Sequence, residues 1–94
     1  MNSKSVYKIP KGKLVKISLE YDENKNTIYN VKITGDFFAY PEESIEILEN
    51  SLKNTELKKQ ILLKKIDSII SSNNIEFIGV DAEGLSEGIM RCLK

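Results

Sequence analysis

KLVKISLEYDENKNTIYNVKIT, residues 13–34, alternates between apolar and polar side chains in two runs. A period of two is typical of a strand with one buried face. The polar residues 22–26 between the runs indicate a hairpin loop, so we expect two antiparallel strands, 13–21 and 27–34, with one face in water. The residues expected to face the core are Val15, Ile17, Leu19, Tyr21, Tyr29, Val31 and Ile33, and those expected to face water are Lys16, Ser18, Glu20, Asn30, Lys32 and Thr34.

The flanking residues predict one more strand and three helices. Residues 5–9 suit a short edge strand that ends at Pro10, which cannot donate to a ladder. Pro41 suits the first position of a helix, with Glu42 and Glu43 in its first turn. This helix would bury Ile45, Leu48 and Leu52. A second amphipathic helix is expected over 56–71, with its apolar stripe formed by Leu57, Ile61, Ile66, Ile69 and Ile70.

The last quarter of the chain is less regular. Residues 75–80, IEFIGV, suit either a strand or an extended connector. Asp81 is a plausible N-cap for a final helix over 82–93, which carries Leu85, Ile89, Cys92 and Leu93 on one side. Gly84 and Gly88 weaken this helix by about 1 kcal/mol each relative to alanine. We therefore expect it to need docking, either on its own sheet or on a partner.

Strands followed by helices indicate the α+β class: a small antiparallel sheet of about three strands covered by helices. Ninety-four residues suggest one domain, 1–94. Equal numbers of basic and acidic residues, 14 each, argue against a nucleic-acid module. No apolar run is long enough to span a bilayer, and the N-terminus has no apolar signal-peptide core, so a cytoplasmic location without membrane contact is expected.

Few residue types for catalysis or metal binding are present. The chain has no histidine and one cysteine, so neither a cysteine cluster nor a histidine base is available. No nucleophile–base pair and no phosphate-loop motif can be recognised, and no catalytic or metal-ligating residue is predicted. Cys92, on the apolar stripe of the last helix, is expected to act as a small buried hydrophobe.

Two short stretches are candidates for a binding site. TGDFFAYP, residues 34–41, holds three of the seven aromatic residues. Asp36 either orients a ligand or partner lysine or satisfies backbone amides in the turn. Phe37 and Phe38 would face opposite sides of a strand, so one ring needs a covering helix or a partner. Lys11 and Lys13 flank Gly12, in a turn that either approaches an anion or is an ordinary exposed turn.

The first half of the chain combines motifs that resemble the accessory domain of lipoate–protein ligases. The motifs are K-x-P-x-GKL at residues 8–14, ITGDFF at 33–38, YPEE at 40–43 and I-x-x-LE-x-x-L at 45–52. GDFF ahead of P-E-E is the most specific part. The second half agrees in length and pattern without a motif of its own. The glycine-rich GGG segment of the catalytic ligase domain does not occur in these 94 residues, so the resemblance implies an accessory domain separate from the catalytic one.

The resemblance implies a fold similar to SufE and to iron–sulfur scaffold proteins. It also implies a non-catalytic accessory subunit that forms a heterodimer with the catalytic ligase chain and acts on lipoyl-acceptor proteins only indirectly. The accessory domain would support formation of lipoyl-adenylate from lipoate and ATP, while lipoate, ATP and magnesium bind in the partner's active site and none binds this chain alone. The partner-facing or nucleotide-proximal residues would be Lys11, Gly12, Lys13, Gly35, Asp36, Phe37 and Phe38.

Two other functions stay open on sequence grounds. A free-standing carrier or interaction domain of the iron–sulfur scaffold type would share the fold, although one cysteine and no histidine speak against metal binding. An enzyme in its own right would need a general base that the sequence does not identify.

Overall fold

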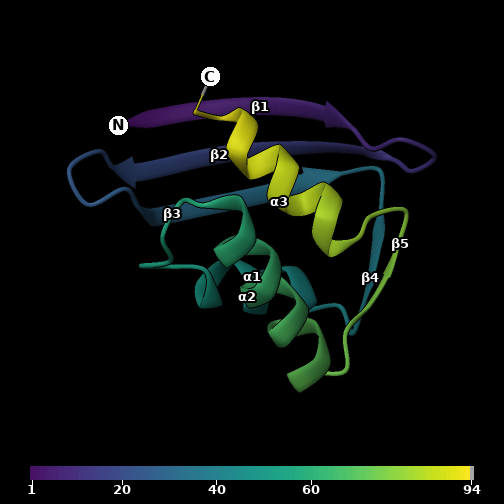
Figure 1. Cartoon of the computed structure of the whole chain (residues 1–94). Helices are drawn as coiled ribbons and strands as arrows, with labels where there is room; N and C mark the ends of the chain where they lie inside the picture. The colour runs from purple at the N-terminus through teal and green to yellow at the C-terminus, as the bar shows by residue number, and fades with distance from the viewer. Residues whose placement is uncertain (94) are drawn as a thin grey trace.

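The computed structural model describes residues 1–93 and has the predicted α+β architecture (Figure 1). Its elements in chain order are β1 (Asn2–Lys8), β2 (Leu14–Asp22), β3 (Thr27–Gly35), β4 (Phe38–Tyr40), α1 (Ser44–Ser51), α2 (Lys59–Ser72), β5 (Glu76–Ile78) and α3 (Ala82–Arg91). Strands β1, β2 and β3 form an antiparallel sheet in that order, and β4 pairs with β5 in a separate two-stranded antiparallel ribbon.

The helices cover one face of the three-stranded sheet. Helix α3 lies over β1 and β2, α1 packs against β3, and α2 packs against α3 (Figure 1). The core lies between the alternating apolar residues of the sheet and the apolar stripes of the helices. Its least exposed side chains include Val15, Ile17, Leu19, Ile28, Val31, Leu48, Leu52, Leu62, Ile66, Leu85 and Ile89. None of the helices in residues 1–93 combines the length and apolar character that a membrane span requires.

A register irregularity between β2 and β3 places one residue of β3 on the face opposite to the predicted one. Tyr29 was expected to point inward, but its side chain is 68% exposed, and Ile28 is fully buried instead. Tyr21 pairs with Ile28 whereas Glu20 pairs with Asn30, so Tyr29 has no partner across the ladder. An extra residue in one strand reverses the faces of the residues beyond it. The prediction was wrong because strict alternation cannot reveal such an insertion.

The observed boundaries of β1 and α1 differ from the predicted ones. Strand β1 begins earlier than predicted, at Asn2 rather than residue 5, and ends at Lys8. Pro41 does not begin a helix, because α1 starts at Ser44, whose N–H donates to the Pro41 carbonyl at 3.0 Å. Glu42 and Glu43 therefore precede the first helical turn.

Helix α2 starts later than predicted and buries a different stripe. The N–H of Leu57 donates to the carbonyl of Asn26 at 2.8 Å, so Leu57 is tied to the β2–β3 loop before the helix begins. The helix then buries Leu62, Ile66 and Ile69, whereas Ile61, predicted to be inward, is exposed.

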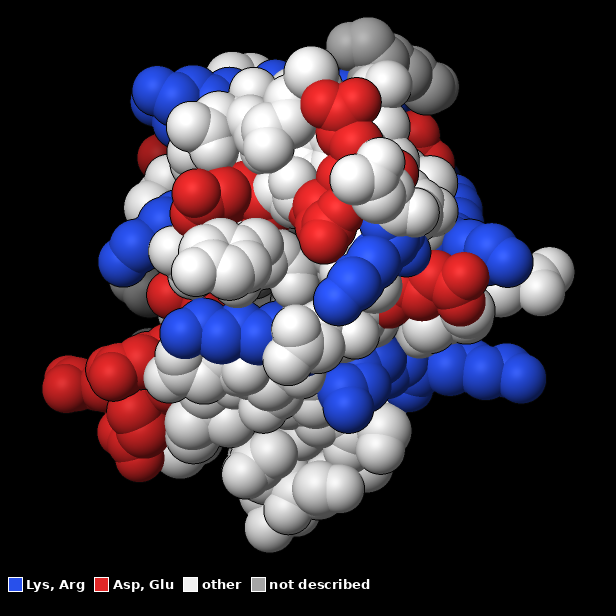
Figure 2. Space-filling model, turned by 90° about the vertical axis from the view of Figure 1, so that its left-hand side faces the viewer, with Lys and Arg blue, Asp and Glu red and all other residues white. Residues whose placement is uncertain are grey.

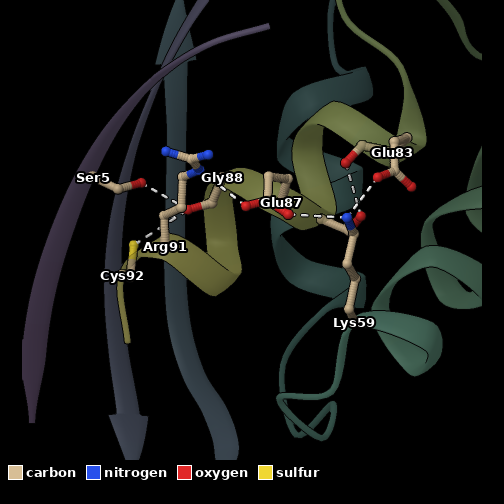
Figure 3. Close-up of polar contacts among 8 residues, drawn as sticks. Ser5, Lys59, Glu83, Glu87, Gly88, Arg91 and Cys92 are labelled. Carbon is tan, nitrogen blue, oxygen red and sulfur yellow. Dashed lines mark hydrogen bonds and ion pairs between the residues drawn. The ribbon is translucent and has the colours of Figure 1, made fainter. Parts of the chain in front are cut away.

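Helix α3 docks on the chain's own sheet. The Asp81 carboxylate accepts a hydrogen bond from the Gly84 N–H at 2.7 Å, which confirms the predicted N-cap. A methyl group at Gly84 or Gly88 would approach the Ile9 or Ile17 side chain to 2.5 and 2.8 Å. The two glycines therefore allow a close approach to the sheet. Strand β1 contributes Ser5, whose Oγ donates to the Gly88 carbonyl at 2.7 Å (Figure 3).

A charged network fixes α3 to α2 (Figure 3). Lys59 Nζ lies 2.5 Å from a Glu83 carboxylate oxygen and 2.9 Å from one of Glu87, which also accepts from Arg91 at 2.9 Å. The hydrogen bond to Glu83, with that to Glu87, raises the pKa of Lys59 to about 12. The hydrogen bonds from Lys59 and Arg91 lower the pKa of Glu87. Burial raises the pKa of the Cys92 thiol, as suits a buried packing residue.

Candidate functional site

Three segments that are distant in sequence meet at one end of the sheet. The Lys13 N–H donates to the Gly79 carbonyl at 2.8 Å, which joins the β1–β2 turn to the residue after β5. The Asp36 N–H donates to the Leu14 carbonyl at 3.2 Å, which joins the β3–β4 junction to the start of β2. We call residues 11–13, 35–37 and 79 the loop cluster. It brings together the sequence-predicted residues Lys11, Gly12, Lys13, Gly35, Asp36 and Phe37.

Glycine is required where these segments touch. A Cβ on Gly12 would lie 2.8 Å from the Gly79 carbonyl oxygen. Gly79 has a φ of +94°, and a Cβ there would lie 2.5 Å from Lys13 Cγ. A Cβ on Gly35 would overlap the Leu14 carbonyl oxygen. The backbones can approach this closely only because these positions lack side chains.

Phe37 and Phe38 face opposite sides, as predicted. Phe37 is half-buried, and its ring meets Phe77 edge-on, with centroids 6.3 Å apart and an interplanar angle of 80°. This geometry is one that aromatic pairs favour. Phe38, in β4, is 63% exposed, so most of its side chain lies open to solvent. One ring therefore anchors the junction, and the other is available to a partner.

The ribbon of β4 and β5 presents an apolar surface to solvent. Phe38 lies opposite Ile78, and Tyr40 lies opposite Glu76. Phe38, Tyr40 and Ile78 are 63%, 53% and 50% exposed. We call these three residues the apolar ribbon face. The ribbon lies beside the main sheet rather than in it (Figure 1), and clustered exposed apolar side chains often mark an interaction site.

The charged candidates lie around this end of the molecule. Lys11 adopts a left-handed backbone conformation, with φ of 61°, and it is exposed, as are Lys13 and Asp36. Lys11 and Gly12 line an open hollow of about 310 Å³ together with Asp81 at the start of α3. Within residues 1–93 the Asp36 carboxylate has no hydrogen bond, and only its backbone N–H is paired. The turn-capping role considered for Asp36 is therefore not observed.

Sequence reasoning missed three residues of this region: Phe77, Ile78 and Gly79. The run IEFIGV left strand and connector open, and only the pairing with β4 shows that Phe77 points inward and Ile78 outward. Gly79, the fifth residue of this run, is a weak signal in the sequence. Its contact with Lys13 comes from chain segments that only the fold brings together.

The chemistry available here is binding chemistry. Ammonium groups and exposed apolar rings can contact an anion and a protein surface. In the described part of the chain, no three histidine, cysteine, aspartate or glutamate side chains gather as a possible metal site.

The sequence of residues 5–89 matches the family described as the bacterial lipoate protein ligase C-terminus. The chain belongs to this family. The match covers both the loop cluster and the apolar ribbon face. It also extends through the second half of the chain, where no single motif had indicated the family.

A protein and a chain of a solved structure, both from Thermoplasma acidophilum, are similar to this member of the family. Lipoate-protein ligase A subunit 2 is 41% identical over 53 residues, which are 56% of this chain and 53% of that protein. The matching stretch thus spans about half the length of that relative. The second likeness is to a chain in the structure of an archaeal lipoylation system, described as a bi-partite lipoate protein ligase and its E2 lipoyl domain. It has a TM-score of 0.78 and 28% identity, and the match covers 95% of this chain and 94% of that one.

Proposed function

We propose that this protein is a non-catalytic accessory subunit that binds a separate catalytic lipoate–protein ligase chain and supports the ATP-dependent formation of lipoyl-adenylate. The observation that carries the proposal is the structural likeness to a chain in the structure of a bi-partite ligase system. The likeness covers 95% of this chain and 94% of that one. The family match over residues 5–89 and the likeness to a ligase subunit support it. Protein lipoylation is then the process that the subunit serves.

The geometry suggests how such a subunit acts. The apolar ribbon face would contact the catalytic chain, and the loop cluster beside it would close over the partner's nucleotide site. Closure excludes water and strengthens charge stabilisation at the phosphate where charge develops. Lys11 and Lys13 supply the charge, and Asp36 lies at the docking edge. Lipoate, ATP and magnesium would bind in the partner's active site.

The decisive experiment measures pyrophosphate release by the catalytic chain from lipoate and ATP, with and without this protein. Release that depends on this protein, together with a complex on a sizing column, is expected. Release that is unchanged by its addition, with no complex, would overturn the proposal.

Lys13→Ala tests the role of the loop cluster. A charge-assisted hydrogen bond contributes about 1.5–3 kcal/mol, so the variant should release pyrophosphate about tenfold to a hundredfold more slowly when the partner is saturated. Lys64→Ala, on the exposed side of α2, is the matched control and should behave as wild type. Unchanged release by Lys13→Ala and by Lys11→Ala would remove the lysines from the mechanism.

A further inference from the structure

Lys8, the first residue of the K-x-P-x-GKL motif, holds the β1–β2 turn from the side of β1. Its Nζ donates to the Gly12 carbonyl at 2.6 Å and to the Ile9 carbonyl at 3.2 Å. Within the turn, the Gly12 N–H donates to the Ile9 carbonyl at 2.8 Å, and the Ile9 N–H donates to the Lys13 carbonyl at 3.1 Å. One ammonium group therefore closes the turn whose last residue is Lys13.

Gly79 holds the same turn from the other side. Its carbonyl accepts the Lys13 N–H at 2.8 Å, and a Cβ on Gly79 would lie 2.5 Å from Lys13 Cγ and 3.2 Å from Lys13 Cβ. The first carbons of the Lys13 side chain thus lie against the bare Cα of Gly79. A side chain at residue 79 would push the lysine stem aside, and the φ of +94° is one that residues other than glycine rarely adopt.

The support formed by Gly79 is itself fixed. Phe77, two residues earlier in β5, meets the Phe37 ring edge-on with centroids 6.3 Å apart, which ties β5 to the β3–β4 junction. The Lys13 stem is therefore held between two parts of the fold, while Lys13 as a whole stays exposed. A long side chain whose stem is already ordered loses less freedom when its charged end binds.

The turn lies where lysines outnumber carboxylates in the local sequence. It carries Lys11 and Lys13, and no aspartate or glutamate occurs among residues 1–19. Asp36 and Asp81 lie on segments that touch the turn, and the Asp81 carboxylate already caps α3. Figure 2 shows the side that faces left in Figure 1, away from the turn, where acidic and basic side chains are interspersed. An anion at the turn therefore meets lysines on the turn itself and carboxylates only on its neighbours.

We propose that Lys8 and Gly79 are positioning residues, which hold the β1–β2 turn so that the Lys13 ammonium points in one direction before the partner's nucleotide arrives; that this ammonium meets a phosphate rests on the proposed function. The Lys8 ammonium is occupied by carbonyls of the turn, and Gly79 has no side chain, so both act through Lys13. A charged group stabilises a transition state only when the residues behind it keep it in place.

The test measures pyrophosphate release by the catalytic chain when it is saturated with this protein. Lys8→Met keeps the stem and removes the ammonium, and Gly79→Ala displaces the Lys13 side chain. Each should slow release about two- to tenfold, the range expected for the ordering of one long side chain. In a Lys13→Ala background each should change release by less than about twofold, because a positioning residue has no effect once the group that it positions is gone.

Two matched variants control for charge and for lost stability. Lys4→Met removes an exposed lysine from the same strand and should release pyrophosphate as wild type. Gly88→Ala adds a methyl group against the Ile17 side chain in the core, so any loss that it causes should be the same in the wild-type and Lys13→Ala backgrounds.

Losses from Lys8→Met and Gly79→Ala that are equally large in the Lys13→Ala background, or no loss from either, would overturn the proposal. If Gly79→Ala does not fold, Lys8→Met decides by the same comparison.

Amide hydrogen exchange on the isolated protein tests the contacts without the partner. The Lys13 N–H should be protected in the wild type and lose its protection in both variants. Unaltered protection in both would overturn the positioning role. If pyrophosphate release does not depend on the wild-type protein, the accessory role fails, and exchange at Lys13 then decides by itself whether Lys8 and Gly79 hold the turn.

Discussion

The Glu49 side chain connects helix α1 to the edge of the sheet. Its Oε2 accepts a hydrogen bond from the Ile33 N–H at 2.7 Å. An edge strand otherwise presents unpaired N–H groups, and this carboxylate satisfies one of them. Glu49 belongs to the I-x-x-LE-x-x-L motif, so that part of the family pattern has a structural explanation.

Removing this acceptor should destabilise the fold. We expect Glu49→Ala to lower the free energy of unfolding by about 1–3 kcal/mol, because a half-buried donor loses a charged partner. Glu49→Gln keeps an acceptor and should cost less. Urea unfolding followed by circular dichroism measures both, and Asn50→Ala, on the exposed side of the same helix, should change stability by about 0.5 kcal/mol or less. Equal stabilities for Glu49→Ala and wild type would show that water satisfies the Ile33 N–H equally well.

At the scale of elements, the contact between α2 and α3 should respond to pH. The lowered pKa of Glu87 means that its carboxylate stabilises the folded state above the usual value of 4.5, and this contribution is lost as the pH falls through the lowered pKa. The contribution of Lys59 to stability depends on pH in the opposite direction. Its pKa is raised from 10.5 to about 12, so its contribution is complete below pH 10.5 and is lost as the pH rises through about 12.

Lys59→Met should therefore lower the Tm by a constant amount between about pH 5 and pH 10. The difference from wild type should shrink as Glu87 becomes protonated at lower pH. Thermal unfolding across this pH range measures it, with Lys64→Met on the exposed side of α2 as the control. A difference that persists undiminished in acid would mean that Lys59 acts through its aliphatic stem rather than through its charge.

At the scale of the whole molecule, we expect the apolar ribbon face to contribute to partner binding and very little to the stability of the fold. Substituting Phe38, Tyr40 and Ile78 together by threonine keeps strand propensity and removes only exposed apolar surface, so the isolated protein should unfold almost as the wild type does. Its Kd for the catalytic chain should rise at least about tenfold, because exposed aromatic residues are the usual energetic centres of such contacts.

Isothermal titration with the catalytic chain measures this Kd. Tyr29→Thr, which removes an equally exposed ring from β3, is the control and should bind as wild type. Wild-type affinity in the triple variant would place the contact elsewhere on the molecule.

Local chemistry in the sequence determined the class of the fold and several of its details. Alternation predicted β2 because each strand residue faces the side opposite to its neighbour, and the Asp81 N-cap followed from its position before an apolar helix. The motifs at residues 8–14, 33–38 and 40–43 indicated the family and the residues of the loop cluster other than Gly79. These features depend on neighbours in the chain, which a sequence displays directly.

Contacts between distant segments were decided only by the tertiary structure. The unpaired Tyr29 in β3, the shifted stripe of α2 and the pairing of β4 with β5 each depend on a partner elsewhere in the chain. The same holds for the hydrogen bond from the Lys13 N–H to the Gly79 carbonyl. The sequence named most residues of the candidate site, but their arrangement into surfaces follows from long-range packing and register, which local pattern does not encode.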